Sequence, residues 1–189
     1  MQDRFNEQSK TERSPSELDP IKLHPLIKRA RDGDSLAFHQ LVLTFDSAVL
    51  QTALRITGSA RIAAELYRRT FLRAFRNLTH FHFECSFSAW IFRQLSQLCM
   101  EHLRQESLQA NSGDDRCLAG VLLHLTPRER MISELKYNHA FSLSLVSEIL
   151  EIPREVARLS ILRAREKMRT AGRAERSCFA QHAFPEEVI

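Results

Sequence analysis

Residues 142–169 read SLSLVSEILEIPREVARLSILRAREKMR, and this short stretch carries the most specific pattern in the chain. Three of its apolar residues have the i, i+3, i+4 spacing of one helix face: Val146, Ile149 and Leu150. The pair Ile152-Pro153 interrupts that helix, because a residue before proline is driven away from the helical conformation. A second amphipathic helix is expected from Arg154, so the pattern predicts a helix, a tight break and a helix.

The two sides of this second helix differ in character. Its apolar side is formed by Ala157, Ile161, Ala164 and Met168, and its basic side by Arg154, Arg158, Arg165 and Arg169. Residues 154–169 carry six basic and two acidic side chains, a local charge of +4. A helix that is buried on one side and cationic on the other suits a helix-turn-helix motif that reads DNA. A charged face is equally typical of an ordinary solvated helix, so that alternative stays open.

The composition indicates a helical protein without a membrane span. The chain has 189 residues, of which 43% are hydrophobic and 26% charged, and it contains only five glycines and six prolines. The formal net charge of +4 permits a polyanionic partner without requiring one. No segment approaches the roughly 18 to 20 consecutive apolar residues that a membrane span needs. The expected location is therefore the cytoplasm.

The sequence contains no motif that predicts an enzyme, a metal site or a bound cofactor. Its four cysteines, at positions 85, 99, 117 and 178, are widely spaced and form no CxxC pair, which argues against a disulfide framework. Histidines accompany three of them, but none of these groups supplies four ligands at the spacing of a zinc site. Phosphate-binding loops and hydrolase or metalloprotease signatures are also missing.

Changes in composition divide the chain into five segments. Residues 1–20 are polar and predict a disordered leader, and residues 21–104 carry the apolar spacing of a first helical domain. Residues 105–117 have the composition of a linker, residues 118–170 form a second helical domain with the helix-turn-helix, and residues 171–189 predict a frayed tail. The expected fold is all-α, with two small helical domains joined by a flexible linker.

Several helix boundaries can be placed within these domains. The first helix is expected to start after Pro25, and Gly58 suits the end of the second helix. An apolar helix is expected over residues 118–125, followed by one that Thr126-Pro127 opens with Glu129 in its first turn.

The predicted helix over residues 60–78 has two distinct faces. Its apolar stripe consists of Ala63, Tyr67, Phe71, Ala74 and Leu78, whereas Arg61, Arg68, Arg69, Arg73 and Arg76 lie on the opposite side together with Glu65.

The segment after this helix, residues 79–88, is unusually aromatic. Its sequence THFHFECSFS and the adjoining helix contain Phe81, Phe83, Phe87 and Trp90. Unstacked bases of single-stranded nucleic acid bind on aromatic rings inside a basic groove, so this cluster is a candidate platform for them. Aromatic residues at a helix junction also commonly fill the core, and both interpretations are kept.

Taken together, the two halves resemble the extracytoplasmic-function sigma factors of bacterial RNA polymerase over residues 26–169. In the first half the matching residues are Ala30, Gly33-Asp34, Ala37-Phe38, Leu41, Ala53-Leu54-Arg55, Gly58, Phe71-Leu72-Arg73-Ala74, Phe81, Ser86-Phe87 and Trp90. In the second half they are Leu125, Pro127, Arg128, Arg130, Leu135, Tyr137, Ser142, Glu148, Ile149, Leu150, Ile152-Pro153 and Arg163-Ala164-Arg165. Their order and spacing across both domains make the resemblance specific.

The resemblance implies a first domain that docks on the clamp of core RNA polymerase and melts the minus-ten element of promoter DNA. It implies a second domain that reads the minus-thirty-five element. The implied site residues are Phe81, Phe87, Trp90 and Arg93 for promoter melting, Arg154, Glu155, Arg158 and Arg165 for DNA reading, and Glu65, Arg68 and Arg69 for polymerase binding. An anti-sigma factor is a further implied partner.

Some positions depart from the family pattern. The helix that meets the clamp is usually acidic in this family, but here Arg68 and Arg69 replace that character and only Glu65 keeps it. Glu151 stands where glycine is usual in the turn, which predicts strain if that residue has a positive φ. The alternative is a sigma-like regulator or protein-interaction module that no longer docks on the clamp.

Overall fold

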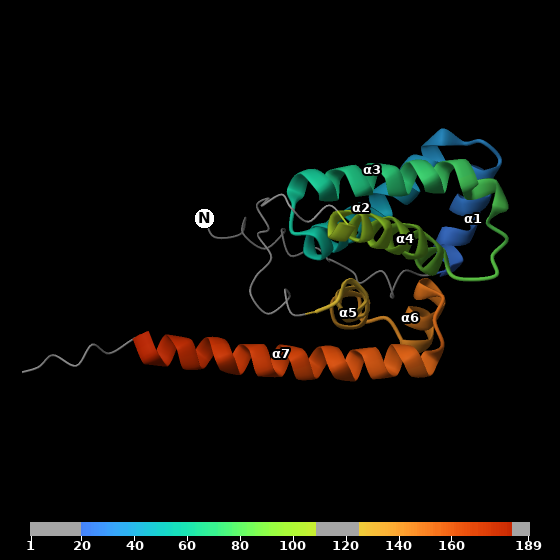
Figure 1. The fold of residues 1–189 in the computed structure, drawn as a ribbon. Helices are drawn as coiled ribbons and strands as arrows, with labels where there is room; N and C mark the ends of the chain where they lie inside the picture. The colour runs from blue at the N-terminus through green and yellow to red at the C-terminus, as the bar shows by residue number, and fades with distance from the viewer. Residues whose placement is uncertain (1–19, 109–124, 183–189) are drawn as a thin grey trace, which may run out of the picture.

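The computed structural model describes residues 20–108 and 125–182, and every regular element in these ranges is helical (Figure 1). In chain order these are α1 (Pro20–Arg31), α2 (Ser35–Thr57), α3 (Ala60–Asn77), the 3₁₀ turn η2 (Leu78–His80), α4 (Phe87–Leu108), α5 (Pro127–Ser133), the π-helical turn η4 (Glu134–Asn138), α6 (Leu143–Leu150) and α7 (Arg154–His182). We call residues 20–108 the N-terminal half and residues 125–182 the C-terminal half. The predicted all-α class is confirmed.

Helices α1 to α4 form the N-terminal half, in which α2, α3 and α4 pack side by side and α1 packs on α2 (Figure 1). Helix α2 is capped by Asp34, whose side chain accepts hydrogen bonds from the backbone N–H groups of Leu36 and Ala37 at 3.0 and 3.1 Å. It ends at Gly58, which has a φ of 70° and closes the helix in the left-handed conformation. The sequence predicted this glycine stop.

Helices α5, α6 and α7 form the C-terminal half, with α7 along the outer side of the α5–α6 pair (Figure 1). At the start of α5, Thr126 accepts a hydrogen bond from the backbone N–H of Glu129, and the Glu129 carboxylate accepts one from the backbone N–H of Thr126. This reciprocal capping box follows Thr126-Pro127 as predicted. Lys167 of α7 then donates to the Glu129 carboxylate at 2.8 Å, which ties α7 to α5.

Three predicted boundaries need correction. Helix α1 begins at Pro20, not after Pro25: proline suits the first helical position, and Pro25 lies inside the helix at the loss of one backbone hydrogen bond. Helix α4 continues to Leu108, so the first four residues of the predicted linker are helical. Helix α7 continues to His182 through much of the predicted tail, where alanine, arginine, glutamate and glutamine favour the helix without an apolar period. The expected helix over residues 118–125 lies outside the described residues except for Leu125, which is buried.

The two halves share one hydrophobic core. Phe92 on α4 is fully buried, and its ring lies 5.3 Å from that of Phe141 and 4.8 Å from that of His139. The same cluster of buried residues takes in Leu41 and Phe45 of α2 as well as further residues of the C-terminal half: Met131, Ile132, Leu135, Val146 and Ile149. The halves are thus packed against each other, although the sequence predicted separate domains.

The turn between α6 and α7 is strained as the sequence predicted. Glu151 has φ 53° and ψ 42°, the left-handed conformation that residues with a β-carbon adopt only with a penalty. In this position its backbone N–H donates to the Ser147 and Glu148 carbonyl groups, which satisfies two carbonyls at the end of α6. The sharp turn directs the chain into α7, so its geometry sets the angle of the helix-turn-helix.

Replacing Glu151 by glycine is expected to raise the free energy of unfolding by roughly 1 kcal/mol, because glycine adopts the left-handed conformation readily. The gain is reduced slightly by the loss of the contact between Glu151 Oε1 and Arg93 Nε at 3.6 Å. Urea denaturation measures the change. Glu151→Gln is the control, since it removes the charge but keeps the β-carbon. Equal stabilisation by both substitutions would show that charge, not backbone strain, is responsible.

Candidate nucleic-acid interface

The predicted DNA-reading residues all lie exposed on one end of α7. Arg154, Glu155, Arg158 and Arg165 are each open to solvent, and we call these four residues the reader face. Among them, Arg158 and Glu155 approach each other at 3.9 Å, a loose and largely exposed ion pair. Such a pair contributes little to stability, so both side chains remain available to a ligand.

The opposite side of α7 is buried as predicted. Ala157 and Ala164 have no exposed surface, and their small side chains let α5 and α6 approach α7 closely. Two basic residues counted in the sequence are engaged within the protein. Lys167 binds Glu129, and Arg169 donates two hydrogen bonds to the Glu166 carboxylate at 2.6 and 3.0 Å. The cationic surface of the reader face is therefore smaller than the local charge suggests.

Burial does not prevent Glu129 from being ionised. Removal from water disfavours its charged form, but hydrogen bonds from Lys167 and Thr126 outweigh this effect and lower the pKa of the Glu129 carboxyl. The charge of Lys167 is thus balanced by an ionised partner at neutral pH, which keeps this lysine away from the reader face.

Two apolar side chains next to the reader face were missed by the sequence reasoning. Leu159 and Leu162 of α7 are 51% and 52% exposed. Both leucines lie on the side of α7 away from its buried stripe, and no helix of the described residues covers them.

The aromatic cluster is mainly core filling. Phe81 is 2% and Phe87 is 5% exposed, and their rings are 5.5 Å apart at a right angle. Trp90 lies 5.3 Å from Phe81 and is only partly buried. Of the two interpretations left open by the sequence, the core-filling one holds for Phe81 and Phe87, whereas Trp90 keeps an accessible edge.

A cavity of about 270 Å³ lies between this loop and α1. Its walls include Phe81 and Phe87 from the loop side and His24 and Ile27 from α1. Phe83, which has a positive φ of 61°, places its ring 4.4 Å from that of His24. The loop therefore encloses a space lined by aromatic rings and does not present a flat platform.

Residues of α1 contribute to this cavity in a way that the sequence did not indicate. The guanidinium of Arg31 lies 5.9 Å from the centre of the Phe83 ring and brings positive charge to the aromatic wall. His24 and Arg31 are about two turns apart on α1. They approach the aromatic loop because α1 packs against a segment more than 50 residues later in the chain, and helical periodicity does not reveal such a contact.

Arg93, predicted to act in promoter melting, is held by the C-terminal half. Its guanidinium donates to the Glu148 carbonyl oxygen at 3.0 Å and lies 4.0 Å from the Glu148 carboxylate and 3.6 Å from that of Glu151. Arg93 is on α4, next in sequence to the central core residue Phe92. The structure thus shows this arginine engaged between the halves and not directed at an open surface.

A second group of polar contacts joins α2 to the C-terminal half. Thr52 donates its hydroxyl proton to the Ala48 carbonyl at 2.8 Å, so its oxygen is left to accept a hydrogen bond from Nε2 of His139 at 2.6 Å. One turn further along α2, Arg55 donates to the Glu134 carboxylate at 3.1 Å. We call these two pairs, together with Arg93 and Glu148, the polar seam.

The polar seam contains two groups with displaced pKa values. Burial, and then the charge of Arg55, lowers the pKa of His139 to about 4. Burial raises the pKa of Glu134 despite its hydrogen bonds with Asn138 and Arg55. His139 is therefore neutral at neutral pH while the halves are packed together.

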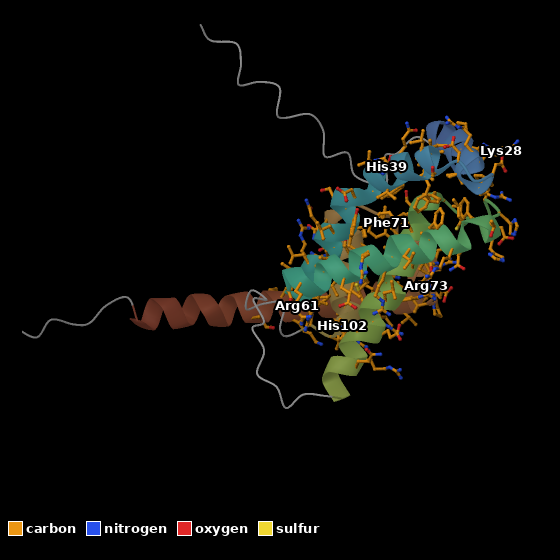
Figure 2. All side chains as sticks on the ribbon, turned by 90° about the horizontal axis from the view of Figure 1, so that it is seen from above. Lys28, His39, Arg61, Phe71, Arg73 and His102 are labelled. Atoms are coloured by element: carbon orange, nitrogen blue, oxygen red, sulfur yellow. The ribbon has the colours of Figure 1, made fainter. Side chains whose placement is uncertain are left out.

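The predicted polymerase-binding residues lie together on the outer face of α3. Glu65, Arg68 and Arg69 are all exposed, and Arg69 approaches the Glu65 carboxylate at 4.0 Å. Figure 2 looks down on this side of the molecule, with Arg61 at one end of α3 and Arg73 farther along toward α4. The face is dominated by arginine, and its one acidic residue is already near an arginine.

Comparisons with known proteins find similar sequences. Residues 41–109 match the family described as sigma-70 region 2. The ECF RNA polymerase sigma factor SigW of Bacillus subtilis (strain 168) is 27% identical over 173 residues, which cover 76% of this chain and 92% of the relative. These matches confirm the family resemblance seen in the sequence.

Two solved structures share the fold. The structure of CnrH in complex with the cytosolic domain of CnrY has a TM-score of 0.66 at 23% identity and covers 82% of this chain and 97% of that one. The sigma factor RpoE from Bartonella quintana, in complex with the anti-sigma factor NepR, has a TM-score of 0.62 at 17% identity and covers 72% of this chain and 96% of that one. None of the helices that the structure describes combines the length and apolar character needed to cross a membrane.

Proposed function

We propose that the chain is a sigma factor similar to those of the extracytoplasmic-function family, and that its two halves divide the work of starting transcription. The C-terminal half reads one promoter element, and the N-terminal half opens another. The observation that carries this proposal is the presence, in one chain, of an exposed reader face on a helix-turn-helix and a cavity lined by Phe81 and Phe87.

The reader face suits the major groove of duplex DNA. Three of its residues occupy the first two turns of the second helix of the motif, the part that contacts base edges in helix-turn-helix proteins. Arginine can donate two hydrogen bonds to guanine, and glutamate can accept one from cytosine. Arg154, Glu155 and Arg158 would read the minus-thirty-five element, while Arg165, farther along the helix, would contact the phosphate backbone.

The N-terminal half has what strand opening requires. A base that leaves the duplex loses its stacking, and aromatic walls restore part of that energy. The cavity lined by Phe81, Phe87 and His24 can receive one unstacked base, and the partly buried ring of Trp90 packs on Phe81 and Phe87 outside the cavity lining. Arg93 would contact the separated strand once it is released from Glu148.

The packed arrangement of the halves would then be a resting form. While the polar seam is intact, Arg93 is bound by α6 and cannot reach DNA. Binding of core RNA polymerase, with Glu65, Arg68 and Arg69 of α3 among the contacts, would separate the halves. An anti-sigma factor that holds them together would keep the protein inactive, and the cytoplasm is where these partners would meet it.

A reconstituted transcription reaction tests the proposed function. The full chain, purified core RNA polymerase and promoter fragments from the source organism are combined, and transcript ends are mapped. We expect transcripts that start at defined sites and depend on the added chain. The absence of such transcripts, together with no co-purification with the polymerase, would support the alternative of a regulator without clamp docking.

Arg158→Ala is expected to weaken binding to a promoter identified in that reaction by about 1–3 kcal/mol, and to relax the preference for one base at one position. Arg163→Ala is a matched control, because Arg163 is also exposed on α7 but lies away from the reader face. Fluorescence anisotropy with promoter duplexes that vary at single positions measures both effects. If Arg163→Ala weakens binding as much as Arg158→Ala, α7 contacts DNA through a different side.

A further inference from the structure

The outer face of α3 is a strongly basic surface on which arginines outnumber carboxylates. We call its five arginines, Arg61, Arg68, Arg69, Arg73 and Arg76, the arginine face, and all five are exposed. Figure 2 shows this side of the molecule, on which Arg61 and Arg73 are labelled. Within the part of the chain that the structure describes, the only ion pair of these five arginines joins Arg69 to Glu65 at 4.0 Å. The surface therefore retains most of its positive charge.

A groove runs beside the arginine face between α3 and α4. It has a volume of about 380 Å³. Arg69, Arg73 and Arg76 line one side of it, and Leu72 and Leu98 provide apolar surface. Glu101 of α4 also lines the groove, but no ion pair joins it to these arginines in the described residues. The groove thus combines an apolar floor with three guanidinium groups.

Apolar residues are interleaved with the arginines. Leu72 is 45% exposed and Phe75 is 53% exposed, and both lie on the outer side of α3 among the arginine side chains. A surface that only follows a phosphate backbone gains little from exposed leucine. Arginine around apolar side chains is instead the composition of protein interfaces, where Arg anchors pair with carboxylates and the apolar centre is covered.

We propose that the arginine face and its groove bind an acidic, amphipathic helix of a partner protein. The apolar side of that helix would cover Leu72 and Leu98, and its aspartate or glutamate residues would pair with Arg69, Arg73 and Arg76. Guanidinium groups bind carboxylates through two parallel hydrogen bonds, so the pairs fix the orientation of the helix as well as attracting it. A helix that lies in a groove with anchors one turn apart is a common mode of peptide recognition.

Charge complementarity selects this occupant. An arginine-rich partner would be repelled by five exposed guanidinium groups, and a purely apolar helix would leave their charge unpaired at the rim. Because the proposal depends only on α3 and α4, it can be tested without polymerase or promoter DNA. Its failure therefore leaves the transcription experiment unaffected.

The test uses the full chain and a synthetic 18-residue peptide helix that carries a leucine stripe flanked by glutamates. Binding is measured by fluorescence anisotropy at two salt concentrations, alongside a peptide in which glutamine replaces every glutamate. We expect the acidic peptide to bind about tenfold or more tightly than the glutamine peptide, with an affinity that falls as salt rises. Equal binding of the two peptides, or no binding of either, would overturn the proposal.

Two variants locate the bound peptide. Arg69→Glu combined with Arg73→Glu is expected to weaken binding about tenfold or more. Lys28→Glu combined with Arg163→Glu gives the same change in net charge at exposed sites elsewhere and should leave the affinity nearly unchanged. Equal loss in both double variants would mean that net charge alone attracts the peptide, which contradicts the proposal.

A non-specific DNA duplex distinguishes the other possible class of ligand. If the arginine face bound nucleic acid instead, the Arg69→Glu, Arg73→Glu variant would lose affinity for DNA. Its affinity for the acidic peptide would then equal that of the unmodified chain. That outcome would replace the proposal with a DNA-binding surface. Leu72→Ala provides a final check, since it should weaken the peptide without altering any charge.

Discussion

Phe92→Ala is expected to lower the free energy of unfolding by about 3–5 kcal/mol, the largest effect of any single substitution considered for this protein. Phe92 is fully buried on α4 and contacts the rings of His139 and Phe141 from the C-terminal half. Alanine would leave a cavity at the point where the two halves meet, and the surrounding helices could fill it only in part. Urea denaturation followed by circular dichroism measures the loss.

A matched substitution separates core packing from the general effect of removing a ring. Phe75 on α3 is 53% exposed, and its ring meets that of Phe38 at 5.0 Å. Phe75→Ala should therefore lower the free energy of unfolding by no more than about 1 kcal/mol. If the two variants were equally stable, Phe92 would not join the halves in solution.

The local structure of the C-terminal half could be predicted from sequence because its signals are short-range. Thr126, Pro127 and Glu129 form a capping box within four residues, and the structure shows both of its hydrogen bonds. The left-handed conformation of Glu151 follows from its position at the break before Pro153. The buried side of α7 is likewise a consequence of helical period, as Ala157 and Ala164 show.

The packing of the halves could not be predicted because it depends on contacts between distant residues. Thr52 and His139 are 87 positions apart, and nothing near either residue indicates the hydrogen bond that joins them. A threonine within an α-helix and a histidine after a helix read as ordinary polar positions. The expectation of independent domains rested on a polar linker, but linker composition does not determine whether the domains that it joins are in contact.

The candidate site was predictable to different extents in its two parts. The reader face could be placed because solvent exposure follows from the period of α7. The residues implied in promoter melting lie around a segment without a helical period, so their exposure could not be predicted. Their aromatic character fits a base-binding surface and a hydrophobic core equally well. The structure assigns Phe81 and Phe87 to the walls of a cavity, adds His24 from α1, and shows Arg93 bound by α6.

These observations connect stability with the proposed function. The shared core around Phe92 favours the packed form. Within the polar seam, Glu148 binds Arg93, the residue that the proposed strand opening requires. The buried pairs of the seam must lose their hydrogen bonds when the halves separate, and water replaces them at little net penalty. A change that acts on the seam should therefore shift the balance between the two forms without disturbing the helices themselves.

Acidification from about pH 6.5 to pH 4 is expected to separate the halves through His139. In the packed form burial, followed by the charge of Arg55, lowers the pKa of His139 from 6.5 to about 4. Exposure to water restores the ordinary pKa, so the separated form binds a proton more readily and gains population as the pH falls. The difference between the two pKa values corresponds to roughly 3 kcal/mol against the packed form once the pH is below 4. Glu134 acts in the opposite direction, because burial raises its pKa and protonation then favours the packed form.

His139→Gln isolates this contribution, since glutamine can still donate to Thr52 but does not titrate. Small-angle scattering follows the radius of gyration with pH, and circular dichroism checks that helix content is retained. We expect the unmodified chain to expand between pH 6.5 and pH 4 and the variant to expand much less. The variant also loses the ring contacts with Phe92 and Phe141, which lowers its stability at every pH. The decisive quantity is therefore the change in radius of gyration with pH, not the radius at any one pH. Expansion of both proteins to the same extent would mean that other groups control the separation.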